Sequence, residues 1–358
     1  MTPAAPIDLT AYAGWDAPIF LIAEAGVNHG GDLDTAREMV RAAAAAGVDA
    51  IKFQTYSASR IATKASAAYW DRTQEPTATQ FELFSKYDAL GEADYRALAA
   101  ECAAAGVLFL TTPFDIDCVS WLEPLVGTWK IASADITNPV LLRRVARTGK
   151  SVALSTGAST LEEIAAAVAL LRAEGAQSIA LLQCTLSYPT AAADAAVGGL
   201  VDLHAHFPEL ALGYSDHTQE ADSYAVIAAA YTLGARVIEK HFTLDASLPG
   251  NDHYHALEPD GFVRLRSELN RLRTILGAPT KDVLDNEQAA RTHARRSLVS
   301  RGDLAAGSVI TEDALDVKRP GTGISPVELD AVLGRRLAVG VPDDTTLQWD
   351  MFEGADER

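Results

Sequence analysis

Residues 151–184 read SVALSTGASTLEEIAAAVALLRAEGAQSIALLQC and contain one complete strand–helix–strand unit. The apolar runs SVALSTG and SIALLQC are typical of buried strands. Between them lies a helix-forming segment, which Thr160 can cap at its start and Gly175 can end. Two successive strands joined by a helix run parallel in one sheet, so this stretch predicts a parallel sheet covered by helices.

The same alternation recurs along most of the chain. Apolar, β-branched runs that read as strands begin at Ile19, Asp49, Val107, Thr128, Ser151, Ser178, Leu210 and Arg236. A last helical segment follows at about 259–276. Eight strand–helix units that end in a helix predict an α/β fold closed into a (β/α)₈ TIM barrel. A doubly wound open sheet is the competing fold, and periodicity alone does not exclude it.

The sequence changes character after the last helix of the predicted barrel. We expect a catalytic barrel domain at 1–276, with an N-terminal extension at 1–17, and a linker at 277–293. Residues 294–358 have short strand candidates, turn pairs and little helix, so they predict a small β-rich domain. Residues 57–91 are too long for a simple loop, and we expect them to form a lid or an interface on the active face.

Composition excludes several classes of partner. The chain has 30 Lys and Arg against 48 Asp and Glu, a formal net charge of −18. Such an acidic protein repels nucleic acid and anionic membrane surfaces, so we expect neither as a partner. Three cysteines and the lack of a secretory signal or a long apolar run predict a cytoplasmic protein. An anionic substrate would need cations at its own site.

Polar residues stand at the carboxyl ends of the predicted strands, where barrels of this type form their sites. They are Glu24, Lys52, Gln54, Thr112, Lys130, Ser133, Asp135, Ser155, Ser215, His217, Glu239 and His241. Lysine and glutamate are costly inside apolar strands unless they are paired. Lys52 and Lys130, with serine hydroxyls beside them, are therefore candidates to hold an anion. The alternative is ordinary surface lysines at polar strand ends.

Two histidines stand at the ends of neighbouring strands. The rings of His217 and His241 can reach one ion in the barrel mouth, and two imidazoles suit a borderline metal such as Mn²⁺, Co²⁺ or Zn²⁺. The alternative is two core histidines bonded to backbone carbonyls. The loop SLPGNDHYHA at 247–256 is rich in Asn251, Asp252 and histidine, a composition that can bind a polyhydroxylated ligand or simply face solvent.

The motifs that carry these residues resemble the N-acetylneuraminate (sialic acid) synthase family. They are IAEAGVNHGG, IKFQTY, TTPFD, KIASAD, LSTGAS, CTLSYPT, GYSDHT, EKHFTLD with PGNDHYHA, and VKRPGTGIS, in that order. The resemblance covers nearly the whole chain, and the C-terminal segment looks like the family's antifreeze-protein-like (SAF) domain. It implies condensation of phosphoenolpyruvate with an open-chain N-acyl hexosamine, above all N-acetylmannosamine, to a nine-carbon 2-keto acid sugar and phosphate.

The resemblance also implies a role for each matched residue. The metal ligands would be His217 and His241, with Mn²⁺ expected and Mg²⁺ or Co²⁺ possible. The phosphoenolpyruvate contacts would be Lys52, Gln54, Thr112, Lys130, Ser133, Ser155, Ser187 and Ser215. The sugar contacts would be Glu24, Tyr188, Asp252 and Arg319, and the catalytic residues Glu24, Asp135, His217 and His241. Arg319 would reach the partner subunit's site, which implies a domain-swapped homodimer.

Two positions depart from the family pattern. Asp135 stands where the family often has Glu, and Leu186 stands where a polar residue is usual, so we expect Ser187 to take over that phosphate contact. The sugar also stays open: a diacetamido-hexose of the legionaminic or pseudaminic type, a 6-phosphorylated N-acetylmannosamine or mannose would fit the same anion site. More distant alternatives are a Schiff-base aldolase that uses Lys130 or Lys52 and a sugar-binding module built on the small domain.

Overall fold

The computed structural model describes residues 4–70, 72, 75–250 and 252–354. The chain divides into two compact units, Met1–Pro279 and Thr280–Arg358, and each is described here by itself. Asn251, which the sequence placed in a ligand-binding loop, lies outside the described residues.

Eight parallel strands form the centre of the first unit. They are β1 (Phe20–Gly26), β2 (Ala50–Thr55), β3 (Leu108–Pro113), β4 (Thr128–Ile131), β5 (Ser151–Ser155), β6 (Ile179–Gln183), β7 (Ala211–Asp216) and β8 (Val237–His241). Their order is β3-β2-β1-β8-β7-β6-β5-β4. The two end strands, β3 and β4, lie against each other, so the sheet curls into a barrel. This confirms the predicted barrel over a doubly wound open sheet.

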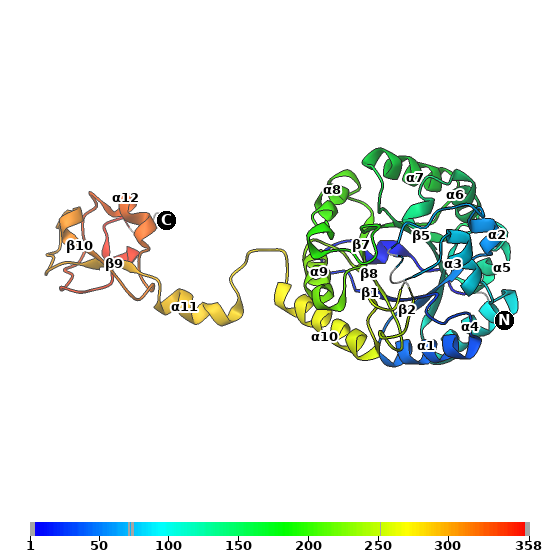
Figure 1. The fold of residues 1–358 in the computed structure, drawn as a ribbon. Coiled ribbons are helices and arrows are strands. Elements are labelled where there is room, and N and C mark those ends of the chain that lie inside the picture. The colour runs from blue at the N-terminus through cyan, green and yellow to red at the C-terminus, as the bar shows by residue number, and fades with distance from the viewer. Residues whose placement is uncertain (1–3, 71, 73–74, 251, 355–358) are drawn as a thin grey trace. The chain divides into compact units, whose positions relative to one another are not determined.

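Helices surround this barrel (Figure 1). They are α1 (Leu33–Ala45), α4 (Glu92–Ala105), α5 (Val119–Leu122), α6 (Pro139–Ala146), α7 (Leu161–Ala173), α8 (Gly199–His206), α9 (Glu220–Thr232) and α10 (Pro259–Leu276). Local sequence sets their ends. The Thr160 side chain accepts a hydrogen bond from Glu163 N in a capping box at the start of α7, and α4 ends at Gly106 with φ +78°.

Apolar side chains fill both sides of the sheet. One cluster packs the strands against the helices, and a smaller cluster fills the lower barrel with residues such as Phe20, Leu110 and Leu182. The N-terminal extension contributes Leu9 to this inner cluster, where it is completely buried. The Leu9 backbone N–H donates to Ser178 Oγ at 2.9 Å. The extension therefore closes the amino end of the barrel and leaves the carboxyl end open.

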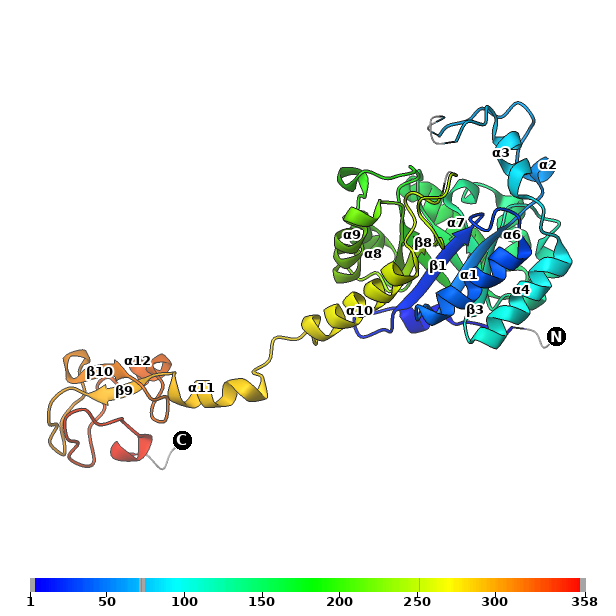
Figure 2. The same ribbon diagram turned by 60° about the horizontal axis from the view of Figure 1, so that its bottom comes forward.

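Residues 57–91 follow β2 and are the segment predicted to form a lid or an interface; we call them the excursion after β2. They contain two helices, α2 (Ala58–Ile61) and α3 (Gln80–Tyr87). Thr79 and Glu82 cap the start of α3 reciprocally. In the view of Figure 2 these helices stand above the barrel, at the carboxyl ends of its strands. The excursion thus lies on the face where the site is predicted.

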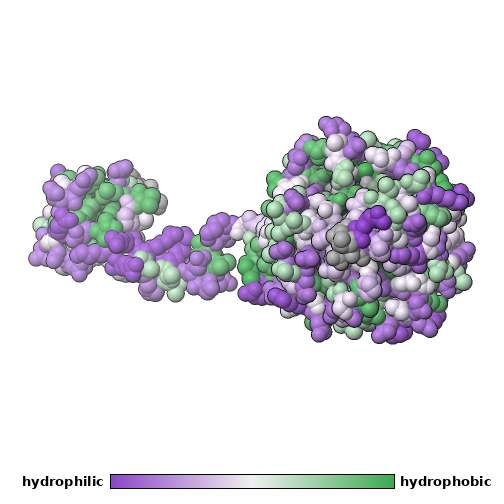
Figure 3. Space-filling model, viewed as in Figure 1, coloured by the Kyte–Doolittle hydropathy of each residue, from purple (hydrophilic) through white to green (hydrophobic). Residues whose placement is uncertain are grey.

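The second unit has its own small core. It contains α11 (Gln288–His293), the antiparallel strands β9 (Ser297–Ser300) and β10 (Leu315–Lys318), and α12 (Leu329–Val332). Apolar residues such as Leu298, Leu337 and Phe352 are fully buried within it. The sequence predicted only a linker at 277–293, yet α11 lies there. Its residues are exposed and mostly hydrophilic (Figure 3), so no apolar face revealed it.

Within the described residues, no helix combines the length and the apolar character that a membrane crossing requires.

A buried histidine after β1 makes stability depend on pH. His29 is 2% exposed, and its Nε2 has no hydrogen-bond partner among the described residues. Burial lowers the pKa of His29 to about 4 from an ordinary 6.5. Between these values the unfolded chain binds a proton that the folded chain does not, so the stability that His29 contributes is complete above pH 6.5 and falls as the pH drops towards 4.

We therefore expect His29 to account for a loss of about 2 kcal/mol of unfolding free energy between pH 7.5 and pH 5. Urea unfolding at the two pH values should show that His29→Gln loses less stability on acidification than the wild type, by about that amount. The exposed histidine variant His206→Gln is the control and should follow the wild type. An equal loss of unfolding free energy between pH 7.5 and pH 5 in His29→Gln and the wild type would contradict the role given to His29.

Candidate active site

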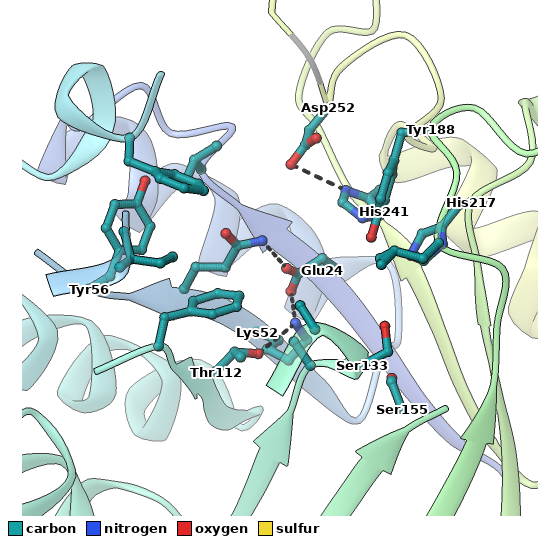
Figure 4. A pocket seen from close by; sticks show the side chains of 18 of the residues that line it. Glu24, Lys52, Tyr56, Thr112, Ser133, Ser155, Tyr188, His217, His241 and Asp252 are labelled. Atoms are coloured by element: carbon teal, nitrogen blue, oxygen red, sulfur yellow. Dashed lines mark hydrogen bonds and ion pairs between the residues drawn. The ribbon is translucent and has the colours of Figure 1, made fainter. Parts of the chain in front are cut away.

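A cavity of about 570 Å³ opens at the carboxyl ends of the barrel strands. Figure 4 shows some of the side chains that line it. All the predicted site residues except two line this cavity: Glu24, Lys52, Gln54, Thr112, Lys130, Ser133, Asp135, Ser155, Tyr188, Ser215, His217, His241 and Asp252. The barrel thus brings together side chains that the sequence spreads over more than two hundred residues.

The two exceptions are Ser187 and Arg319. Ser187 is exposed and does not line the cavity, whereas Leu186 does. Cys184, Leu186 and Tyr188 line the cavity, whereas the Ser187 hydroxyl donates to the Pro189 carbonyl oxygen at 3.5 Å. The structure therefore does not bring Ser187 to the predicted phosphate contact. Arg319 is an exposed residue of the second unit.

Two lysines and two glutamates form the buried floor of the cavity. The Lys52 ammonium lies 2.6 Å from Glu24 Oε2 and 3.7 Å from Glu239 Oε2. The Lys130 ammonium lies 3.6 Å from Glu239 Oε1. All four side chains are at most 5% exposed. Glu239, to which the sequence assigned no role, links the two lysines. It faces the cavity because it stands two residues before His241 on the same strand.

Hydroxyl groups surround the lysines. Lys52 donates to Thr112 Oγ1 at 3.2 Å, and Lys130 donates to Ser155 Oγ at 2.7 Å. Ser215 donates to Glu239 Oε1 at 2.8 Å. Two ammonium groups with hydroxyl donors around them can hold phosphate and carboxylate oxygens through charge-assisted hydrogen bonds. The local cations offset the acidic surface, as the sequence required.

The two carboxylates of the floor differ in proton affinity. Burial, together with the charge of Glu239, raises the pKa of Glu24 against the opposing effect of Lys52. Burial alone would also raise the pKa of Glu239, but Lys130 and Lys52 together hold it below its ordinary value. Gln54 donates to Glu24 Oε1 at 2.9 Å and fixes that carboxylate. Of the two, Glu24 is the better candidate for a general base, because a raised pKa improves proton transfer near neutral pH.

An aromatic and histidine cluster forms one side of the cavity (Figure 4). The ring centroids of His217 and His241 are 5.5 Å apart, and Tyr188 lies 4.3 Å from the His217 ring. His217 Nδ1 is 2.8 Å from the Thr185 carbonyl oxygen, which leaves Nε2 as the nitrogen available to a ligand. Burial lowers the pKa of His217 to about 4, so its ring stays neutral, as metal binding requires.

One cluster of metal-binding groups includes a histidine that the sequence left without a role. His241, Asp252 and His255 each offer a ligand atom, and these atoms all lie within 4.8 Å of one another. Among the described residues this is the one group of three or more such side chains with that geometry. His241 Nδ1 lies 3.7 Å from Asp252 Oδ2. The group could hold a metal ion, and His255 is its additional member.

Asp135 and Asp252 are the other carboxylates of the cavity. Asp135 Oδ1 accepts a hydrogen bond from Asn138 Nδ2 at 3.0 Å, and burial raises its pKa. Burial and the nearby Glu24 charge raise the pKa of Asp252 to about 7. With a pKa of about 7, Asp252 can take up or release a proton near neutral pH.

Lys240 lies on the opposite face of β8, as strand parity predicts. Its ammonium lies 2.8 Å from Asp216 Oδ2, and both side chains are completely buried. Lys240 does not line the cavity. It is thus a structural counterpart of Lys52, buried and paired to the same degree but turned away from the site.

The excursion after β2 forms the outer wall of the cavity. Its lining residues are Arg60, Ile61, Tyr69, Trp70, Gln80, Leu83, Phe84 and Tyr87. Most of these side chains are aromatic or apolar. Arg60 is the one cation among the lining residues that the structure describes in this segment. It lies 2.5 Å from Asp117 Oδ2, and both side chains are exposed. The outer wall is therefore much less cationic than the floor.

Comparison with known proteins gives matches to both units. Residues 39–281 match the NeuB family, and residues 295–353 match the SAF domain. The N,N'-diacetyllegionaminic acid synthase of Legionella pneumophila is 37% identical over 341 residues, which cover 93% of this chain and 94% of that protein. The enzyme of the same name from Campylobacter jejuni is 36% identical over 333 residues, which cover 92% and 98%.

A solved structure is also similar. The N-acetylneuraminic acid (sialic acid) synthetase of Leptospira borgpetersenii is 33% identical and superimposes with a TM-score of 0.68. That match covers 77% of this chain and 90% of the other.

Proposed function

Because this chain belongs to the NeuB family of phosphoenolpyruvate-condensing, sialic-acid-type synthases and ends in a SAF domain, we propose that it joins phosphoenolpyruvate to an unphosphorylated, open-chain N-acyl hexosamine. The products would be a nine-carbon 2-keto acid sugar and phosphate. The observation that carries the proposal is the buried Lys52–Glu239–Lys130 floor beside the histidine cluster, at the open end of the barrel.

The lysine floor would bind phosphoenolpyruvate. Lys52 and Lys130 would hold its phosphate and carboxylate, with Thr112, Ser155 and Ser215 as hydroxyl donors. The remaining predicted contacts, Gln54 and Ser133, line the same cavity. Because the site is buried, these charges act in a medium of lower dielectric than water, where they stabilise an anion more strongly. They need not move during the reaction, which is the condition for electrostatic preorganisation.

The bond changes follow from these groups. C3 of phosphoenolpyruvate forms a bond to the aldehyde carbon of the sugar, the aldehyde oxygen takes up a proton from solvent to become a hydroxyl, and water adds to C2. Glu24, with Asp135 as the alternative, takes the proton of that water. The C2 intermediate then releases phosphate by cleavage of its C–O bond, and the C2 hydroxyl gives up its proton to the departing phosphate as the keto group forms. The two lysines hold the leaving group. Tyr188 and Asp252 would position the sugar at the opposite side of the cavity.

The family's metal fits the donor groups of this site. His217 has one ring nitrogen on a backbone carbonyl and the other available, and His241 Nδ1 is buried without a hydrogen-bond partner among the described residues. A divalent metal held by His217 and His241, Mn²⁺ by expectation, would supply Lewis acidity towards the aldehyde oxygen of the sugar. Asp252, beside His241, contributes the negative charge that such an ion needs.

The lining of the cavity favours a neutral sugar. The cations among its described lining residues are Lys52, Lys130 and Arg60. The first two belong to the phosphoenolpyruvate floor, and Arg60 is paired with Asp117. A 6-phosphorylated sugar would find little positive charge at the outer wall. The aromatic side chains there, such as Trp70 and Tyr87, instead suit acetamido groups, which have an apolar methyl beside a polar amide.

We infer that a diacetamido-hexose of the legionaminic type is the first candidate, with N-acetylmannosamine second. Two relatives that are 37% and 36% identical over almost their whole length are named as legionaminic-type synthases. The Leptospira enzyme, which is named for sialic acid, supports N-acetylmannosamine at 33% identity. The family resemblance had put N-acetylmannosamine first, and the names of these relatives are the reason for the reversed order proposed here.

Phosphate release from phosphoenolpyruvate tests this proposal directly. The metal-loaded enzyme would be assayed with 2,4-diacetamido-hexoses, N-acetylmannosamine, its 6-phosphate and mannose. We expect kcat/KM to be highest for a diacetamido sugar and lowest for the 6-phosphate and mannose. Release with none of these sugars would reject the synthase function, and a preference for the 6-phosphate would reject the neutral-sugar assignment. Trapping of substrate by borohydride would instead support the Schiff-base aldolase.

We further propose, from the family resemblance, that Arg319 of the small domain reaches the partner subunit's site in a cytoplasmic, domain-swapped homodimer. Arg319 is exposed and so can reach another molecule. It would bind the sugar and not phosphoenolpyruvate.

A further inference from the structure

The loop that follows β8 brings a third histidine against His241. His255 is completely buried. Its ring centroid lies 4.6 Å from that of His241 and 5.7 Å from that of Tyr188. His255 has no role in the proposed reaction. A buried polar ring beside an active-site histidine therefore needs a physical explanation.

Three ring nitrogens in this place have no hydrogen-bond partner among the described residues. They are Nδ1 and Nε2 of His255 and Nδ1 of His241. An unpaired buried nitrogen costs about 1–3 kcal/mol, so three of them side by side would be a large penalty. His253, in the same loop, has its Nδ1 2.8 Å from Thr243 Oγ1. The unpaired nitrogens are thus specific to His241 and His255.

A carboxylate completes the group. Asp252 Oδ2 lies 3.7 Å from His241 Nδ1, and the ligand atoms of His241, Asp252 and His255 lie within 4.8 Å of one another. The three nitrogens are closed to bulk solvent. Two imidazole nitrogens and one carboxylate oxygen are a common ligand set for such cations.

The lysines around this group are each paired with a carboxylate, so their charges do not prevent the binding of a cation. Lys240 is paired with Asp216 at 2.8 Å, and Lys52 is paired with Glu24 at 2.6 Å. Asp252 has no comparably close lysine or arginine partner among the described residues. Its charge can therefore be shared with an ion.

We propose that His255 is a further metal ligand, which with Asp252 supplements the pair His217 and His241 in holding one divalent cation. The proposal rests on the proposed function only in taking this ion to be the one that the synthase reaction uses. The added ligands would help to retain the ion before any substrate enters. Because most of the proposed donors are imidazole nitrogens, the site should prefer a borderline ion such as Co²⁺ to Mg²⁺.

Metal binding without substrates tests this proposal. The full-length chain, stripped with EDTA, would be titrated calorimetrically with Co²⁺ alone and with Mg²⁺ alone. We expect the wild type to bind Co²⁺ more tightly than Mg²⁺. His255→Ala should weaken Co²⁺ binding by about 100-fold, the scale expected when a metal site loses a supporting group. His253→Ala, a histidine of the same loop with a hydrogen-bonded Nδ1, is the matched control and should bind Co²⁺ as the wild type does.

Two outcomes would overturn the proposal. One is an unchanged Co²⁺ affinity in His255→Ala, and the other is an equal loss in His253→Ala, which would indicate general damage to the loop. If His255→Ala does not fold, Asp252→Asn, which keeps the side-chain shape, should show the same loss of Co²⁺ affinity, and an unchanged affinity there would reject the site. These titrations use neither substrate, so they separate the ligand assignment from the proposed synthase reaction.

Discussion

Replacing Lys52 by methionine is expected to lower kcat/KM for phosphoenolpyruvate by about 10³-fold, the upper range for loss of one group that stabilises an anionic transition state. Methionine keeps most of the apolar stem but removes the ammonium, which lies 2.6 Å from Glu24 and 3.7 Å from Glu239. The variant should also be less stable by about 3–5 kcal/mol, because two buried carboxylates lose their counter-ion. Steady-state kinetics and urea unfolding measure the two effects.

The variant Lys240→Met is the control that separates the effect of losing a buried lysine on stability from the effect on catalysis. Lys240 is as deeply buried as Lys52 and lies 2.8 Å from Asp216, but it faces away from the cavity. We expect a comparable loss of stability with a much smaller change in the KM for phosphoenolpyruvate. A second control is the double variant Lys52→Met/Glu24→Gln, which should regain stability but not activity. If Lys52→Met and Lys240→Met raised that KM equally, Lys52 would be only a structural residue.

The second large effect is expected for His241→Ala. His241 belongs both to the predicted pair with His217 and to the three-residue group with Asp252 and His255. Its loss should abolish tight metal binding and lower kcat by about 10³-fold, which corresponds to several kcal/mol of lost charge stabilisation. The fold should survive, because the backbone pairing of His241 with Glu24 does not need the side chain.

Metal affinity, turnover and circular dichroism of His241→Ala would test this expectation together. Treatment of the wild type with EDTA should reproduce the loss of turnover, and added Mn²⁺ should restore it. The exposed variant His206→Ala controls for the removal of any histidine. Normal turnover in His241→Ala with a native spectrum would refute a metal-dependent mechanism at this site.

The sequence predicted the barrel because its signals are local. Strand–helix units such as 151–184 carry their own periodicity, caps and stops, and each forms in the structure close to its expected bounds. Parity within a strand also explains why Lys52 and Gln54 face the cavity and why Lys240 does not. The same parity extended past β6 would have put Leu186 and not Ser187 at the cavity.

Sequence reasoning by itself determined the α/β class of the fold, the end of the strands that carries the site and many of the polar side chains that line it. All of these follow from the two-residue period of strands and from the rule that parallel strands end on one face. Only the tertiary structure decided that Glu239 links two lysines and that His255 meets His241. Such contacts depend on the register between strands and on the path of a loop, which short-range patterns do not encode.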